Sequence, residues 1–170
     1  MNSTKDVAKG VDKEVNIVRI FDAPRELVFK AWSSSSHLSN WYFPGTCSVT
    51  IYKLEFKPGG VFQHSINQPD GTPCMCKGEY TEIVENEKIV YKLGFCDADG
   101  NFISSSQTDK HSWPDETTVT VMFEDYEGKT KLTLQQTVSE ELAKQTGAYP
   151  SWLEMLDKLE KETVKIEEAK

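Results

Sequence analysis

The stretch TVTVMFEDYEGKTKLTLQ, residues 118–135, decides the fold class of this chain. It consists of two alternating apolar and polar runs on either side of Glu127-Gly128, and a two-residue loop there places Val121 opposite Leu134 and Phe123 opposite Leu132. The same register predicts these pairs on the other face: Glu124 with Lys131, Met122 with Thr133 and Thr120 with Gln135. One face is apolar and the other largely polar, so the hairpin indicates an antiparallel sheet that covers a core on one side.

Turn residues divide the preceding region, from Cys47 onward, into further strands. The turns are Pro58-Gly59-Gly60, Pro69-Asp70-Gly71 and Glu85-Asn86-Glu87. This spacing predicts an antiparallel meander. The stretch from Asp97 to Glu116 is long and polar, and we expect a mobile excursion between two strands there.

Helical patterns stand at both ends of this sheet. A strand from Val15 to Phe21 leads to a helix that Asp22 can cap, with Pro24 in its first turn. Its apolar positions are Leu27, Val28, Ala31 and Trp32, and a short second helix carries Leu38 and Trp41. Near the C-terminus an i, i+3, i+4, i+7 stripe predicts a long amphipathic helix with Trp152, Met155, Leu156, Leu159 and Ile166 on one face. That face must lie on the sheet.

Several stretches in this order resemble the activator-of-heat-shock-protein-90-ATPase-like family, within the START and birch-pollen-allergen (SRPBCC) superfamily. They are Phe21–Trp32, Leu38–Trp41, Pro58–Phe62, Pro69–Thr72, Gly78–Tyr80, Thr118–Phe123 and Gly128–Leu134. The resemblance implies an α+β helix-grip fold, in which a curved antiparallel sheet wraps around a long C-terminal helix and a short helix pair follows the first strand. We expect one domain over residues 1–170, with an ordered core from about 14 to 166.

Composition narrows the classes of partner and compartment. A formal net charge of −8 without a dense Lys/Arg stripe disfavours nucleic acid. The segment from Met1 to Glu14 is polar, and no apolar run reaches membrane-spanning length, so we expect a cytoplasmic protein without a membrane partner. Its four cysteines should then be free thiols, and the chain is expected to be a monomer or a homodimer.

The favoured function is binding of a small apolar or amphipathic ligand between the sheet and the C-terminal helix. We expect these residues to line the site: Trp41, Phe62, His64, Cys76, Tyr80, Tyr91, Phe95, Phe123, Trp152 and Leu156. Trp32 and Trp113 are further aromatic residues that could line it or fill the core. The resemblance implies an alternative, a chaperone-associated module for protein interaction.

The strand register predicts where the polar residues of this site lie. A three-residue loop at Pro69-Asp70-Gly71 places His64 opposite Cys76. The next hairpin, turning at Asn86-Glu87, is predicted to pair Val84 with Ile89, Tyr80 with Leu93 and Gly78 with Phe95. His64 and Cys76 should therefore face the interior, either as polar contacts for a ligand or as buried groups bonded to protein or water.

No catalytic, metal or cofactor motif outweighs these readings. Asp97-Ala98-Asp99-Gly100-Asn101 is superficially similar to a calcium loop, but Phe102 and Thr108 stand where Gly and Glu are needed, so a solvated turn is favoured. Cys74, Cys76 and His64 are soft ligands without a second ligand pair, and buried thiols are favoured. An inward Glu82 would permit hydratase or cyclase chemistry, whereas a solvated Glu82 near the sheet edge is the favoured alternative. We expect no cofactor, no metal and no catalytic residue.

Overall fold

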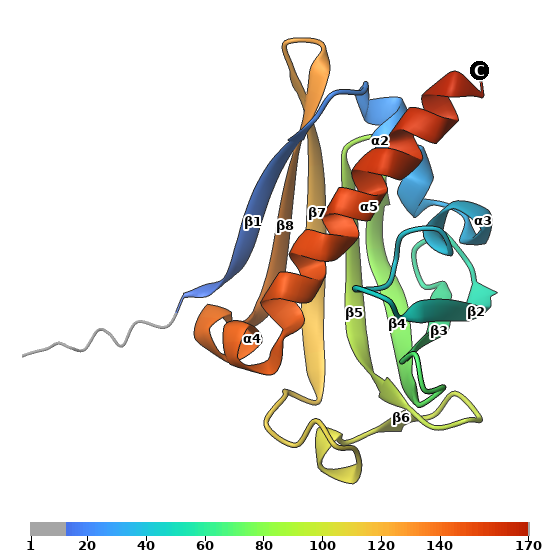
Figure 1. The fold of residues 1–170 in the computed structure, drawn as a ribbon, viewed down its shortest axis with the longest axis vertical. Helices are drawn as coiled ribbons and strands as arrows, with labels where there is room; N and C mark the ends of the chain where they lie inside the picture. Colours follow the sequence, from blue (N-terminus) through green and yellow to red (C-terminus); the bar gives the residue numbers. More distant parts are fainter. Residues whose placement is uncertain (1–12, 170) are drawn as a thin grey trace, which may run out of the picture.

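The computed structural model describes residues 13–169, and in it a curved antiparallel sheet wraps around the C-terminal helix (Figure 1). The elements are β1 (Glu14–Phe21), α2 (Arg25–Trp32), α3 (Ser35–Leu38), β2 (Ser48–Leu54), β3 (Val61–Asn67), β4 (Pro73–Val84), β5 (Lys88–Cys96), β6 (Phe102–Ile103), the 3₁₀ helix η1 (Ser105–Gln107), β7 (Glu116–Tyr126), β8 (Lys129–Ser139), α4 (Glu140–Thr146) and α5 (Ala148–Glu168). The strand order is β1-β8-β7-β5-β4-β3-β2, and β6 pairs with β5. This is the α+β helix-grip architecture that the sequence predicted.

The β7–β8 hairpin confirms the predicted register at every pair. Val121 lies opposite Leu134 and Phe123 opposite Leu132, and all four side chains are buried. Glu127 and Gly128 both have positive φ, 52° and 84°, as the two central residues of a type I′ turn require. The turn residues therefore set which face of this hairpin is apolar.

The β3–β4 register is also confirmed. Gly71 has a φ of 92°, and this left-handed position closes the loop so that His64 lies opposite Cys76 and Phe62 opposite Gly78. His64 and Phe62 are buried on the inner face. The prediction that His64 and Cys76 are cross-strand neighbours on one face is correct.

The predicted β4–β5 register was wrong. Val84 pairs with Lys88 rather than Ile89, because the turn uses three residues and Asn86 takes the left-handed conformation. A bulge between Tyr80 and Glu82 then shifts the register by a second residue. As a result, Tyr80 pairs with Tyr91 rather than with the predicted partner two residues further along β5.

The pair Gly78 and Phe95 is corrected in the same way, since Gly78 lies opposite Leu93 and Phe95 lies opposite Cys76. Two shifts of one residue leave the inner face of this part of β4 unchanged, because side chains alternate with a period of two. Only the segment between turn and bulge changes face. There Val84 is exposed, and Ile83 packs against the core in its place.

The helical segments differ from the sequence prediction at their ends. Pro24 is the residue that precedes α2, and no side chain caps this helix, so the predicted Asp22 cap is absent. The short α3 ends at Leu38, before Trp41, and its cap is Ser34, whose Oγ accepts from the His37 amide at 3.4 Å. The pattern did not predict α4, which Gly147, at φ 89°, separates from α5.

The stretch from Asp97 to Glu116 is built into the fold rather than being a plain excursion. Its strand β6 pairs with β5, and η1 has a capping box at Ser104. Asp115 Oδ1 accepts hydrogen bonds from the Ser105 amide at 2.8 Å and from Ser104 Oγ at 3.0 Å. These bonds hold the segment against the end of the sheet (Figure 1).

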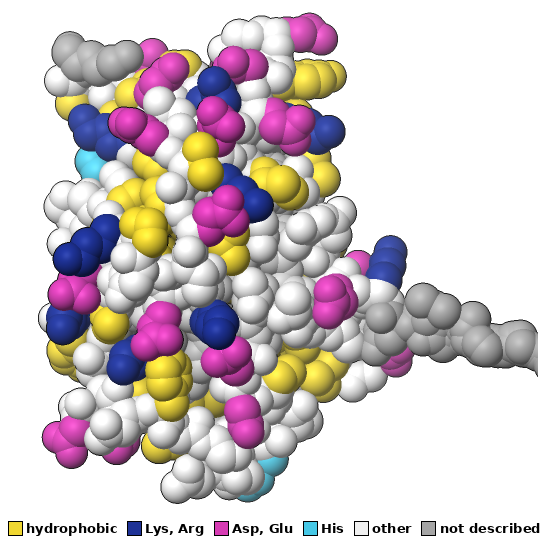
Figure 2. Space-filling view, turned by 180° about the vertical axis from the view of Figure 1, so that it is seen from behind, with side chains coloured by type: hydrophobic (Ala, Val, Ile, Leu, Met, Phe, Trp, Pro, Cys, Tyr) yellow, Lys and Arg dark blue, Asp and Glu magenta, His cyan; other side chains and the backbone are white. Residues whose placement is uncertain are grey.

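The core lies between the inner face of the sheet and α5. All five apolar stripe residues of this helix are buried: Trp152, Met155, Leu156, Leu159 and Ile166. Helix α2 packs beside α5 at its C-terminal half. The opposite side of the molecule, seen in Figure 2, carries interspersed acidic and basic side chains with scattered hydrophobic ones. The sheet is thus one-sided, as its alternation predicted.

Candidate ligand-binding site

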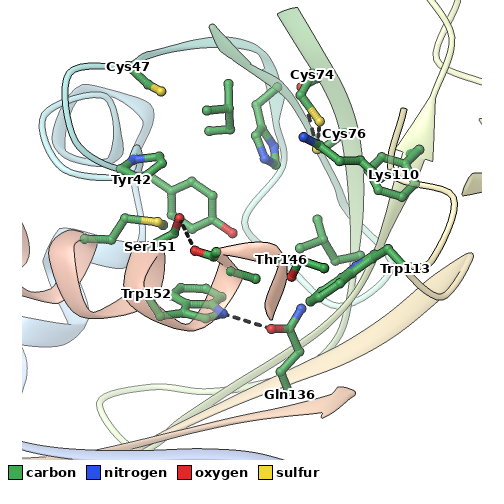
Figure 3. Close-up of a pocket in the computed structure, with 18 of the residues that line it drawn as sticks. Tyr42, Cys47, Cys74, Cys76, Lys110, Trp113, Gln136, Thr146, Ser151 and Trp152 are labelled. Carbon is green, nitrogen blue, oxygen red and sulfur yellow. Dashed lines mark hydrogen bonds between the residues drawn. The ribbon is translucent and has the colours of Figure 1, made fainter. Parts of the chain in front are cut away.

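A cavity of about 520 Å³ lies between the inner face of the sheet and the N-terminal half of α5. Its walls come from β3, β4, β5 and β8, from the segment after α3, and from the loop before β7 (Figure 3). Exposed residues at its border are Gln68, Asp109, Lys110, Ser112 and Thr146. The cavity is therefore open to solvent at the end of the sheet where β6 and η1 lie.

A buried chain of hydrogen bonds crosses the wall of this cavity. Trp152 Nε1 on α5 donates to Gln136 Oε1 on β8 at 2.9 Å (Figure 3). Gln136 Nε2 in turn donates to Thr117 Oγ1 on β7 at 3.0 Å. Gln136 is 4% exposed. Because a buried amide without partners is costly, these bonds fix its orientation and link α5 to the sheet.

His64 contributes a neutral polar group to the cavity. Its ring stacks on Phe62 with centroids 4.2 Å apart, and it is 1% exposed. Burial lowers the pKa of His64 to about 4, so the imidazole is uncharged near neutral pH. Within residues 13–169 its Nδ1 has no hydrogen-bond partner. This nitrogen is enclosed by the protein and has no exposed surface.

Two tyrosine hydroxyls form a second polar pair beside the cavity. Tyr42 Oη lies 2.9 Å from Tyr91 Oη, and both residues are buried. Desolvation raises the pKa of each hydroxyl far above its usual value, so both stay neutral. Tyr42 lines the cavity, whereas Tyr91 lies behind it.

Two thiols stand on the β4 wall. Cys74 Sγ lies 3.9 Å from Cys76 Sγ, and Lys110 reaches toward them from the loop before β7 (Figure 3). The hydrogen bond from Cys76 is the main cause that lowers the pKa of Cys74 to about 7, and the Lys110 charge lowers it further. The pKa of Cys76 is raised by the same bond and by burial. Cys74 is thus the more acidic thiol of the pair, and Cys76 is the less acidic one.

The structure divides the predicted site residues into two groups. His64, Cys76, Phe95 and Trp152 line the cavity. The remaining six are packed into the core and do not line it: Trp41, Phe62, Tyr80, Tyr91, Phe123 and Leu156. Trp41, for example, is fully buried and donates its indole N–H to the Ala31 carbonyl at 3.0 Å.

Sequence reasoning missed several lining residues, and some of them had a signal. Gln136 continues the inward alternation of Leu132 and Leu134, so a polar residue on the core face was visible in the sequence. Cys74 shares the face of Cys76 by strand period alone. Lys110 has no such signal, because it lies in a polar stretch without periodicity.

The two alternative sites that the sequence raised take other forms. Asp97 Oδ1 accepts the amides of Asp99 and Asn101, both at 2.9 Å, so this loop is a turn that satisfies its own carboxylate. Across residues 13–169 no group of three or more His, Cys, Asp or Glu side chains is arranged to hold a metal ion. Glu82 is exposed on the outer face and lies 3.3 Å from Lys88 Nζ, so it cannot act in the cavity.

Comparisons with known proteins agree on a fold and a family. The model of the family described as "Activator of Hsp90 ATPase homolog 1-like protein" matches residues 22–163. A solution structure from Staphylococcus epidermidis is 26% identical with a TM-score of 0.74, over 89% of this chain and 90% of that one. One from Arthrobacter aurescens is 25% identical with a TM-score of 0.75, over 95% and 90%. A crystal structure of a Silicibacter pomeroyi protein that carries the family's name is 19% identical with a TM-score of 0.70, over 89% and 98%. No curated protein matches the sequence.

The helices of residues 13–169 include none with the length and apolar character to cross a membrane.

Proposed function

Since the chain belongs to the family of Activator of Hsp90 ATPase homolog 1-like proteins, we propose that it uses the helix-grip fold of that family to bind a small apolar or amphipathic molecule between the sheet and α5. The observation that carries this proposal is the cavity of about 520 Å³. Ligand pockets are typically about 300–1,000 Å³, mostly apolar, with a few convergent polar groups. The lining fits that description.

The lining also indicates the chemistry of the ligand. Ile66, Leu93, Phe95 and Met155 offer apolar contact for its body. The uncharged polar side chains of Tyr42, His64 and Gln136 also line the cavity. At the mouth, Lys110 Nζ lies 3.9 Å from Asp109 Oδ1, so the Asp109 carboxylate offsets the positive charge that would attract an anionic ligand. A neutral ligand with one polar group is therefore favoured over a charged one.

The test is to recover what the protein holds. The protein is purified without detergent and denatured in organic solvent, and mass spectrometry compares the extract with that of the variant Gln136→Leu. We expect a lipophilic compound at up to one per chain, reduced in the variant because Gln136 orients Trp152 across the cavity. A panel of neutral amphiphiles is then titrated against tryptophan fluorescence, which Trp152 and Trp113 report. An empty extract and no saturable change with any compound would reject the proposal.

The description of the family supports a second candidate, association with heat shock protein 90. The chaperone of the same cell is mixed with this protein, and its ATPase rate and complex formation are measured. An increased rate with a defined complex would support this activity. An unchanged rate without a complex would remove it, and leaves the ligand proposal standing.

A further inference from the structure

The thiol pair on β4 is placed for chemistry that simple ligand binding does not need. Cys74 and Cys76 stand on the same strand face, 3.9 Å apart at sulfur, and both line the cavity. Both are half-buried rather than sealed in the core. Cys76 lies opposite His64, whose ring also borders the cavity. Both thiols and the His64 ring therefore border the same cavity.

Strand geometry disfavours a disulfide between these cysteines. Alternate residues of a strand are separated by about 6.6 Å along its axis. A disulfide needs Cβ atoms roughly 3.5–4.5 Å apart, so closure would distort β4. Because β4 is paired on both sides, by β3 and β5, its backbone resists that distortion. The pair is therefore held as two thiols.

The surroundings make the two thiols unequal. Cys76 Sγ donates to the Cys74 carbonyl oxygen at 3.6 Å and lies 3.9 Å from Cys74 Sγ, a contact in which either thiol can donate. The Lys110 ammonium adds a positive charge from the loop, which Asp109 partly offsets. Together the contact with Cys76 and the Lys110 charge favour the Cys74 thiolate, while Cys76 keeps its proton. The arrangement is that of a nucleophile with a proton donor beside it.

We propose that Cys74 is a covalent capture site for apolar electrophiles of the α,β-unsaturated carbonyl class, with Cys76 as the proton donor. The inference rests on the proposed ligand-binding function, because the electrophile must first occupy the cavity. The Cys74 thiolate forms a bond from Sγ to the β-carbon, and the π electrons of the C=C bond move to the carbonyl oxygen as an enolate. The Cys76 thiol then transfers its proton to the α-carbon, and the resulting Cys76 thiolate regains a proton from water.

The experiment uses trans-chalcone as the electrophile and its saturated analogue, 1,3-diphenylpropan-1-one, as a ligand of similar shape that cannot add. Adducts are counted by intact mass and mapped by peptide mass spectrometry in the wild type, Cys74→Ser and Cys47→Ser. Cys47 is the matched control, since it lines the same cavity without a neighbouring thiol. We expect one adduct, at Cys74, formed roughly tenfold or more faster than any at Cys47. Cys47→Ser should still form its adduct at Cys74.

The saturated analogue separates the two proposals. If it binds saturably while chalcone forms no adduct, or adds to Cys47 as fast as to Cys74, covalent capture is wrong and ligand binding stands. If the analogue does not bind and no neutral amphiphile changes the tryptophan fluorescence, both proposals fail.

The pH profile of the wild type gives a second readout that a merely structural role would not produce. The groups facing Cys74 are Cys76 on its own strand, Asp109 and Lys110 from the loop, His64 from β3 and Cys96 from β5. We expect adduct formation to rise with a midpoint near pH 7. In Cys76→Ala the midpoint should move upward and lower the rate at pH 7 roughly tenfold, with rates converging above pH 9, whereas Cys76→Ser should retain part of the effect. An unchanged midpoint in Cys76→Ala would overturn the pairing.

Discussion

The two halves of α5 lie on one sheet but face different surroundings. From Leu156 to Ile166 the helix packs on a filled core beside α2, whereas from Ala148 to Met155 it borders a cavity of about 520 Å³. The stripe of apolar residues is continuous across both halves and is buried throughout. An amphipathic helix on a one-sided sheet therefore does not by itself determine whether the space between them is filled.

The difference comes from a third layer of side chains. In the closed half, aromatic rings from α2 and the following segment pack on the sheet: Trp32 lies 4.6 Å from Trp41, and Phe29 lies 5.4 Å from Phe123, between ring centroids. In the open half Tyr42 and loop residues such as Trp113 border the space between sheet and helix without filling it. Rings from α2 and from the segment after α3 close one end, and the loop before β7 leaves the other accessible.

Truncating a ring in the closed half should have the largest effect. Phe123→Ala removes a fully packed side chain and should lower the free energy of unfolding by about 3–5 kcal/mol. Met155→Ala borders existing empty space, so we expect a loss below about 2 kcal/mol. Urea denaturation of both variants checks this difference, and equal losses would mean that the two halves are packed alike.

Lowering the pH should destabilise the protein through His64, which borders the cavity in the open half. The pKa of His64 is lowered by burial from its ordinary 6.5 to about 4. Between these values the unfolded chain binds a proton that the folded protein does not, so stability present above pH 6.5 is lost as the pH falls toward 4. At about 1.4 kcal/mol per pH unit, the loss attributable to His64 reaches about 3 kcal/mol.

The control for this pH dependence is His64→Leu, which cannot titrate. Denaturation at pH 7 and pH 4 should show that the wild type loses about 3 kcal/mol more than the variant over this range. Parallel losses in the two proteins would show that His64 is not buried as described.

The buried carboxylate of Glu162 joins α5 to the segment around α3, and its removal should have an intermediate effect on stability. Glu162 on α5 is 4% exposed, and its Oε2 lies 2.8 Å from His37 Nδ1 and accepts from Asn40 Nδ2 at 3.1 Å. Glu162→Ala leaves both partners without it, and we expect a loss of about 1–3 kcal/mol. Thermal unfolding measures this, with the exposed neighbour Glu160→Ala as the control that should change little. A similar loss in both variants would contradict a specific role for the buried contacts.

The smallest effect on stability is expected at the loop that borders the cavity. Asp115→Ala removes the acceptor for Ser104 and Ser105 on the exposed side of the fold, which should cost about 1 kcal/mol or less. Local opening should nevertheless increase, so hydrogen exchange at residues 104–113 should accelerate while exchange in α5 stays the same. Equal acceleration in both segments would show that the loop is not a separate unit.

This contrast also explains what the sequence could predict. Turn residues determined the registers of β3–β4 and β7–β8, because Gly71 and Gly128 need left-handed backbone at defined positions. The β4–β5 register was missed, since its turn uses three residues rather than two and a bulge at Thr81 has no glycine or proline to mark it. Local chemistry thus specifies a hairpin only where the turn leaves a residue signature.

The sequence predicted which face of the sheet carries the site, but not which half of that face borders the cavity. His64 and Phe62 stand two residues apart on one strand face, yet only His64 borders the cavity. The reason is that Phe62 lies among the rings of Tyr42, Tyr80 and Tyr91. The position of Tyr42, in the segment after α3, depends on long-range packing. The alternation of residues within a strand cannot predict where that segment packs.

The central claim is that the open half is a ligand site, and filling the cavity tests it most directly. The double variant Ile66→Phe/Leu93→Phe adds volume from two strands that line it, and Val18→Phe, on an exposed position of β1, is the matched control. Binding of the uncharged dye N-phenyl-1-naphthylamine is titrated by its fluorescence in each folded protein. We predict saturable binding, one dye per chain, in the wild type and in Val18→Phe, and a loss of roughly tenfold or more in affinity in the double variant. Equal dye binding by all three proteins would contradict the claim.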